Sequence, residues 1–133
     1  MQSGTPKRVL IVEDHPHIAR ILNDVLNRAG YITNVAMNGA VGVTRARNMP
    51  PDLILMDVSM PVLNGFDAAA EIRQQEKLRD VPIVFLTSST DRVDRERGSQ
   101  LGARAYLTKP FSPRALVEVV QKIFTGDPAQ SAP

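Results

Sequence analysis

The sequence predicts an α/β fold in which five parallel strands, in the order 2-1-3-4-5, form a doubly wound sheet flanked by five helices. Two observations support this prediction. Short apolar segments rich in branched residues alternate with amphipathic segments of helical length, and such alternation produces right-handed crossovers and a parallel sheet covered on both faces. Three of the apolar segments, the first, third and fourth, are apolar almost throughout, which is typical of central strands buried on both faces.

The five predicted strands are short, apolar and rich in branched side chains. The third, LILMD, differs from the others because its apolar run leads directly into a carboxylate, which is costly to bury without compensation. The predicted strands are Lys7–Val12, Ile32–Ala36, Leu53–Asp57, Ile83–Thr87 and Ala105–Thr108.

The first and fifth helices have the clearest signals. Apolar residues recur at helical spacing through residues 18–29 and 116–124. The first helix should end at Gly30, and the fifth should begin near Ser112, before a first-turn proline, and end at Gly126. The second helix, near residues 40–47, and the third, near 66–75, are less sharply patterned, and the fourth, near 91–101, is the least apolar.

Length and composition indicate one globular domain. The 133 residues, 43% of them hydrophobic and 23% charged, suit a domain with its own core over residues 7–125. The small, polar, proline-bearing tails, residues 1–6 and 126–133, are predicted to be disordered. Neither a membrane span nor a secretory signal is present, so we expect a cytoplasmic protein.

Residue types limit the possible chemistry. The chain has no cysteine, and two histidines, His15 and His17, are too few for a histidine-built metal site, so any metal is expected on oxygen ligands. The formal charge of +2 comes from scattered basic residues, and direct nucleic-acid binding is not expected. Its only support is a mildly basic cluster of Arg92, Arg95 and Arg97.

Polar residues follow four of the five predicted strands. In a doubly wound sheet the carboxyl ends of the central strands form the ligand site. Each residue also has an ordinary structural explanation, such as a helix cap, a turn, a strand position or a solvated lysine. The residues concerned are Glu13 and Asp14, Asp57, Thr87 with Ser88, and Lys109.

Considered together, these residues favour a functional site. Three carboxylates within about 4 Å of one another repel by roughly 4 kcal/mol per pair at an effective dielectric near 20. A hard cation on oxygen ligands relieves that repulsion, and Mg²⁺ suits a site of few carboxylates. A metal ion, the Lys109 ammonium and a hydroxyl around Asp57 are what phosphoryl transfer requires, with Asp57 as nucleophile.

Four motifs resemble, in order, those of the receiver domain of two-component response regulators. They are LIVEDHP, LILMDVSMPVLNG, IVFLTSS and GARAYLTKPF, and the resemblance covers residues 7–125. It implies the flavodoxin-like receiver fold and a phosphoprotein switch of bacterial two-component signalling. Such a switch is not an enzyme in the usual sense, because it catalyses only its own phosphoryl acceptance and autodephosphorylation.

The resemblance also implies residue roles. Glu13, Asp14, Asp57 and the backbone carbonyl of Ser59 would hold Mg²⁺, for which Mn²⁺ can substitute, and Asp57 would accept the phosphoryl group. The remaining roles are binding of the phosphoryl oxygens by Thr87, Ser88 and Lys109, switching by Thr87 and Tyr106, and a cis bond before Pro110. Ser59 and Ser89 would flank the line of hydrolytic attack.

Partners follow from the same resemblance. A sensor histidine kinase or a histidine phosphotransfer protein would donate the phosphoryl group. A downstream protein would bind the face formed by the fourth helix, fifth strand and fifth helix, where the weakly apolar helix 91–101 is a plausible two-state element. The chain would be a monomer or a phosphorylation-dependent dimer. From its length we favour a stand-alone receiver over one cut from a longer regulator.

Two other functions are considered. Haloacid-dehalogenase-like phosphatases also use a strand-end aspartate with Mg²⁺, but they need a second acid two residues later, where this chain has Ser59. A flavodoxin-like cofactor carrier needs a phosphate-cradling loop after the first strand, where this chain has EDHPH.

Overall fold

A computed structural model describes residues 5–60, 63–88 and 92–126, with only the backbone described at positions 92 and 93. All strand pairs are parallel, and the sheet order is β2-β1-β3-β4-β5, which confirms the predicted topology. The described residues exclude positions 1–4 and 127–133, which make up most of the two tails predicted to be disordered. They also exclude Ser89 and position 91, where the fourth helix was expected to begin.

The elements closely follow the predicted ranges. The strand β5 begins two residues earlier than expected, because Ala103 pairs with Ile83 while Ala105 pairs with Val84, so Arg104 is an extra residue that interrupts the alternation. A short 3₁₀ turn, η1 (Glu76–Leu78), was not predicted, since three residues show no periodicity. The strands are β1 (Arg8–Val12), β2 (Ile32–Ala36), β3 (Leu53–Asp57), β4 (Ile83–Thr87) and β5 (Ala103–Thr108), and the helices are α1 (Pro16–Arg28), α2 (Gly39–Asn48), α3 (Gly65–Arg73), α4 (Arg92–Gln100) and α5 (Pro113–Thr125).

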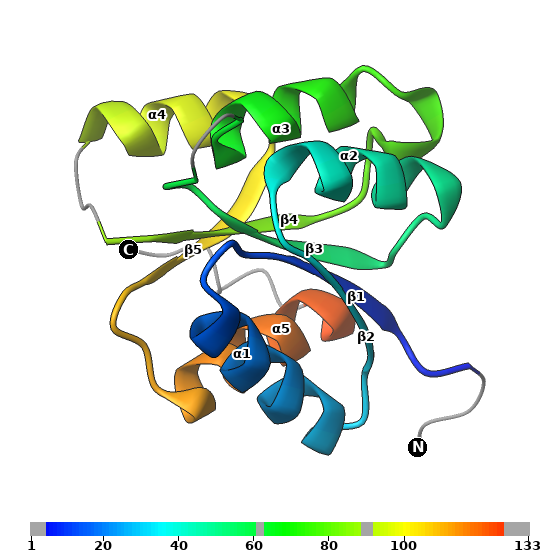
Figure 1. Cartoon of the computed structure of the whole chain (residues 1–133), viewed down its shortest axis with the longest axis vertical. Coiled ribbons are helices and arrows are strands. Elements are labelled where there is room, and N and C mark those ends of the chain that lie inside the picture. The colour runs from blue at the N-terminus through cyan, green and yellow to red at the C-terminus, as the bar shows by residue number, and fades with distance from the viewer. Residues whose placement is uncertain (1–4, 61–62, 89–91, 127–133) are drawn as a thin grey trace.

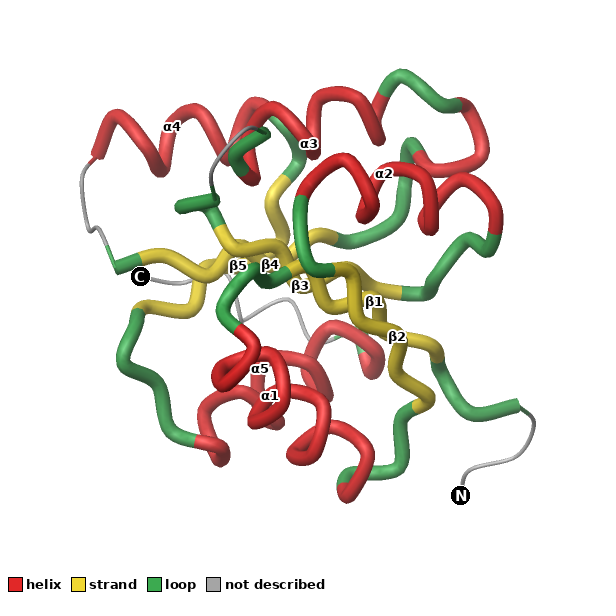
Figure 2. The backbone as a smooth tube through the Cα atoms, viewed as in Figure 1, coloured by secondary structure: helices red, strands yellow, loops and turns green. Residues whose placement is uncertain are grey.

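The molecule has three layers. Helices α1 and α5 cover one face of the sheet, and α2, α3 and α4 cover the other (Figures 1 and 2). Successive side chains of a strand enter opposite cores: Val9 and Ile11 pack toward α1 and α5, whereas Leu10 and Val12 pack on the other side. All residues of β3 and β4 are buried, while the edge strands β2 and β5 are partly exposed, as predicted.

Local signals place the helix ends. The Ser112 hydroxyl accepts a hydrogen bond from the backbone N–H of Ala115 and begins α5, and Gly126 ends it in the left-handed conformation at φ 78°. Both positions match the sequence analysis. None of the helices in the described ranges is long and apolar enough to cross a membrane.

Candidate functional site

The carboxyl ends of β1, β3, β4 and β5 meet at one edge of the sheet. Glu13 and Asp14 follow β1, Asp57 ends β3, Thr87 ends β4 and Lys109 follows β5. Ligand atoms of Glu13, Asp14 and Asp57, here called the acidic cluster, lie within 4.8 Å of one another together with a ring nitrogen of His15. Across the described residues, no other group of three or more acidic or histidine side chains lies close enough to share a metal ion.

The two carboxylate oxygens of Asp57 differ, because one accepts hydrogen bonds and the other accepts none from the described part of the chain. Its side chain is 1% exposed. Its Oδ1 accepts hydrogen bonds from Lys109 Nζ at 3.0 Å and from the backbone N–H of Ser59 at 3.2 Å. Its Oδ2 is buried and accepts no hydrogen bond from the described part of the chain. A buried carboxylate oxygen without a partner is unfavourable unless a ligand or ion occupies the space beside it.

Glu13 is fully buried beside Asp57. Its Oε2 accepts a hydrogen bond of 3.2 Å from the backbone N–H of His15, and its Oε1 lies 3.4 Å from Lys109 Nζ. Burial and, next, the negative charge of Asp57 raise the pKa of the Glu13 carboxyl above its usual range. The fold therefore pays an electrostatic cost for keeping two carboxylates together.

Lys109 offsets part of that cost. Burial alone would lower the pKa of its ammonium group, but the hydrogen bond and charge of Asp57, followed by the charge of Glu13, outweigh burial and raise it. Lys109 is therefore a fixed positive charge at neutral pH. The Lys109–Pro110 peptide bond is cis. One lysine does not balance three carboxylates, and this oxygen-rich donor set fits a hard divalent cation.

Asp14 and His15 complete this edge of the sheet. Asp14 is not the cap of α1, since the N-cap residue is His15. Asp14 Oδ1 is buried and, among described residues, accepts no hydrogen bond, although His15 Nδ1 lies 3.5 Å away. We expected oxygen ligands alone, and the approach of the His15 ring to these carboxylates was not predicted. Its position directly after two acids at a strand end was the available signal.

The loop after β3 closes tightly against the site. A Cβ at Gly65 would lie 2.9 Å from the Cα of Val58, so only glycine allows this approach. Asn64 then begins α3, because its side chain accepts a hydrogen bond of 2.9 Å from the backbone N–H of Asp67. The Asn-Gly pair at the end of the second motif thereby sets the path of the chain past Asp57. Ser59, in the same loop, is exposed.

The predicted switch residues lie on β4 and β5. Thr87 is 5% exposed and Ser88 is exposed. Tyr106 stacks on Phe85 at 6.1 Å between ring centroids and donates a hydrogen bond of 2.6 Å from its hydroxyl to the carbonyl oxygen of Arg95. In this structure the Tyr106 ring lies against α4.

Polar and arginine–aromatic contacts hold α4. Arg97 forms an ion pair of 2.7 Å with Asp67 and lies over the Phe66 ring, and Arg95 lies over the Tyr106 ring. Both side chains thereby fasten α4 to α3 and β5.

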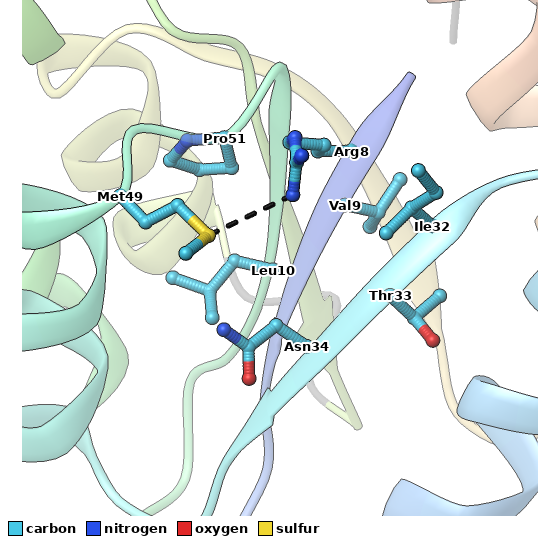
Figure 3. Close-up of a pocket in the computed structure, with 8 residues that line it drawn as sticks. All are labelled: Arg8, Val9, Leu10, Ile32, Thr33, Asn34, Met49 and Pro51. Atoms are coloured by element: carbon cyan, nitrogen blue, oxygen red, sulfur yellow. Dashed lines mark hydrogen bonds between the residues drawn. The ribbon is translucent and has the colours of Figure 1, made fainter. Parts of the chain in front are cut away.

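A hollow lies at the end of the sheet opposite the acidic cluster. It is a cavity of about 220 Å³ between the beginnings of β1 and β2 and the end of α2 (Figure 3). Arg8 reaches across it toward the Met49 sulfur at 3.6 Å, and exposed Ile32 forms part of its wall. No acidic or histidine side chain lines it, in contrast to the carboxyl ends of the strands.

Solved structures resemble the whole described fold. Chemotaxis protein CheY4 of Vibrio cholerae superposes with a TM-score of 0.87 at 32% identity, covering 90% of this chain and 99% of that one. The receiver domain of the sensor histidine kinase PA1611 of Pseudomonas aeruginosa, solved with a magnesium ion coordinated in its active-site cleft, superposes with a TM-score of 0.81 at 37% identity, covering 89% and 97%.

Sequence comparisons lead to the same family. Protein PilH of Pseudomonas aeruginosa is 35% identical over 119 residues, which cover 90% of this chain and 98% of PilH. The transcriptional regulatory protein BaeR of Escherichia coli O6:H1 is 38% identical over 123 residues, covering 92% of this chain, and the chain spans about half the length of BaeR and similar curated relatives. The family model of the response regulator receiver domain matches residues 9–121. The chain therefore belongs to the response regulator receiver domains, which are signalling switches of two-component systems.

Proposed function

We propose that Asp57 accepts a phosphoryl group from a phosphohistidine on a sensor histidine kinase or a histidine phosphotransfer protein, and that the phosphorylated domain controls a downstream partner. The observation that carries the proposal is the state of Asp57: a buried carboxylate, fixed through Oδ1 by Lys109, whose Oδ2 has no hydrogen-bond partner in the described chain. A positioned carboxylate of this kind can act as a nucleophile. The proposed domain extends over residues 7–125.

The acidic cluster would hold a divalent ion. Glu13, Asp14, Asp57 and the backbone carbonyl of Ser59 would bind Mg²⁺, with Mn²⁺ as a substitute. This assignment is supported by the buried oxygens of Asp14 and Asp57 that accept no hydrogen bond in the described chain, and by the magnesium-bound receiver domain of PA1611. When bound, the ion supplies positive charge against which the transferring phosphoryl group is stabilised.

The chain's own residues would perform the remaining steps. As an Asp57 oxygen forms a bond to phosphorus, the phosphorus–nitrogen bond of the donor breaks and its electron pair remains on the imidazole. The Lys109 ammonium, which already contacts Asp57 at 3.0 Å, would bind one phosphoryl oxygen, and the Thr87 hydroxyl and Ser88 would bind others. Later attack of water on phosphorus releases inorganic phosphate and restores the carboxylate.

The signal would leave through Thr87, Tyr106 and α4. Thr87 ends the strand beside Asp57, and Tyr106 connects the next strand to α4 through Arg95. Movement of Thr87 toward a phosphoryl group would alter the packing of Tyr106 and shift α4, which is the kind of two-state element that phosphorylation biases. The face formed by α4, β5 and α5 would bind the downstream partner. The domain itself would be a monomer or a phosphorylation-dependent dimer.

Both alternative functions lose their support. The position two residues after Asp57 holds Ser59, which cannot serve as the acid and base that a phosphatase of the haloacid-dehalogenase type needs. The family match likewise disfavours a cofactor carrier.

The proposal is tested by incubating the chain with acetyl phosphate and Mg²⁺ and measuring its intact mass. We expect one added phosphoryl group in the unmodified chain and none in Asp57→Asn. Asp52→Asn is the matched control, because Asp52 lies just before the other end of β3 and is exposed. Labelling of Asp57→Asn equal to that of the control would overturn the proposal.

A further inference from the structure

We propose that His15 is a nitrogen ligand of the ion held by the acidic cluster, and that it shifts the preference of the site from Mg²⁺ toward Zn²⁺ and similar first-row transition ions. The inference depends on the proposed function, because the same carboxylates hold the ion. It concerns which ion binds and how tightly.

The geometry brings a ring nitrogen to the cluster. His15 Nδ1 lies 3.4 Å from Glu13 Oε2 and 3.5 Å from Asp14 Oδ1. One ligand atom from each of His15, Glu13, Asp14 and Asp57 lies within 4.8 Å of all the others. Two ligands bound at about 2.0–2.2 Å to one ion lie no more than about 4.4 Å apart, and the separations of 3.4 and 3.5 Å between His15 and the two carboxylates fall within that limit.

The carboxylates beside His15 need such an ion. The Asp57 side chain is only 1% exposed. Its Oδ2 and the Oδ1 of Asp14 accept no hydrogen bond in the described chain. The Asp57 oxygen points to a bound cation independently of His15, whereas Asp14 Oδ1 lies 3.5 Å from the His15 ring nitrogen. The imidazole then decides which cation is favoured.

Ligand chemistry gives the direction of the preference. Carboxylate, carbonyl and water ligands suit Mg²⁺, whereas imidazole suits Zn²⁺, Ni²⁺ and Cu²⁺. Replacing one water by a neutral imidazole nitrogen therefore adds affinity for transition ions and little for Mg²⁺. The side chain of His15 is 64% exposed and makes no capping hydrogen bond to α1, so the ring is available to rotate onto an ion.

A different role for His15 predicts an opposite result. If His15 serves only as an ion-pair partner of Glu13 and Asp14, it competes with any bound cation. Its removal would then strengthen, or leave unchanged, the binding of every divalent ion alike. A ligand role instead predicts a selective loss of transition-ion affinity.

The first test is calorimetric titration of the full chain with MgCl₂ and, separately, with ZnCl₂. We expect His15→Phe to weaken Zn²⁺ binding about tenfold or more, since even groups that only orient a metal ligand contribute that much, and to leave Mg²⁺ binding within about twofold. His17→Phe is the matched control, because His17 is exposed and lies outside the cluster.

A second measurement needs no variant. In a chain carrying ¹⁵N-labelled histidine, saturating Zn²⁺ should shift the Nδ1 resonance of His15 and leave both nitrogens of His17 unchanged. The inference would be overturned if His15→Phe and the control bound Zn²⁺ with equal affinity, or if the His15 resonance did not move. In either case, binding of Mg²⁺ by the unmodified chain would leave the proposed function standing. Failure of the unmodified chain to bind either ion would overturn both.

Discussion

Tyr106 donates a hydrogen bond of 2.6 Å from its hydroxyl to the backbone carbonyl of Arg95, and so fastens β5 to α4. The phenol reaches that carbonyl because Gly98, one turn further along α4, has no side chain in its path. A Cβ at Gly98 would lie 2.9 Å from Tyr106 Cζ, well inside normal contact distance. Gly98 therefore permits the observed position of the Tyr106 ring.

Gly98→Ala should displace the Tyr106 ring and break its bond to Arg95. Overpacking of this kind costs about 1–3 kcal/mol in the free energy of unfolding, measurable by urea titration, and the ring resonances of Tyr106 should shift. Ser99→Ala, an exposed neighbour on the same helix, is the control. Unchanged stability and unchanged Tyr106 resonances in Gly98→Ala would contradict this account of the contact.

Glu13→Gln should make the metal-free domain more stable at neutral pH. Burial and the charge of Asp57 raise the pKa of folded Glu13 above its ordinary value of 4.5. Because the folded protein binds the Glu13 proton more tightly than the unfolded chain does, protonation of Glu13 stabilises the fold. This contribution is complete below about pH 4.5 and is lost as pH rises through the folded pKa. The advantage of Glu13→Gln should thus grow as pH rises above 4.5, by about 1.4 kcal/mol for each pH unit between that value and the folded pKa.

The measurement is urea unfolding from pH 4 to pH 8 in the presence of a chelator, scanned at about half-unit steps. Glu71→Gln, at an exposed position on α3, controls for the loss of one carboxylate. If Glu13→Gln is less stable than the unmodified chain at pH 7, the carboxylate is favourably placed and the argument from repulsion is wrong.

Mg²⁺ should raise the melting temperature of the domain. An ion that binds only the folded state adds about 2.7 kcal/mol at 100 times its Kd, and it also relieves the repulsion within the acidic cluster. Asp14→Asn should abolish most of the shift, whereas Asp24→Asn, at an exposed position on α1, should retain it. Equal shifts in the two variants would place the bound ion elsewhere on the protein.

Arg73→Lys should destabilise the fold although it keeps the charge. The Arg73 guanidinium donates hydrogen bonds to four backbone carbonyls at once, joining the segment after α3 to the turn before β5. A lysine ammonium cannot reproduce this planar set of donors, and the carbonyls left without a donor cost about 1–3 kcal/mol. Thermal unfolding against the control Arg79→Lys, an exposed position, measures the effect. Equal melting temperatures would show that water replaces the guanidinium at no cost.

Local patterns were enough to predict the strand order and the central strands. The apolar runs of β1, β3 and β4 are long enough to show burial on both faces, and the polar residue after each run then marks the edge where the site lies. The contacts of α4 could not be predicted in this way. They join Arg97 to Asp67 and Tyr106 to Arg95, pairs whose partners lie on different elements and leave no periodic signal.

His15 shows a different limit. Counting histidines excluded a histidine-built site, but a mixed site needs only one, and whether the ring faces the carboxylates depends on the turn between β1 and α1. The bulge at Arg104 is similar, because it is defined by pairing with β4 and not by the sequence of β5 alone.

The central claim is that Asp57 carries the phosphoryl group, and trapping the modified residue tests it most directly. The chain is phosphorylated with acetyl phosphate and Mg²⁺ and then reduced with borohydride, which converts an aspartyl phosphate to homoserine, and peptide mass spectrometry locates the change. We predict homoserine at position 57 and unmodified aspartate at positions 14 and 52. Homoserine at another position with Asp57 intact would contradict the account.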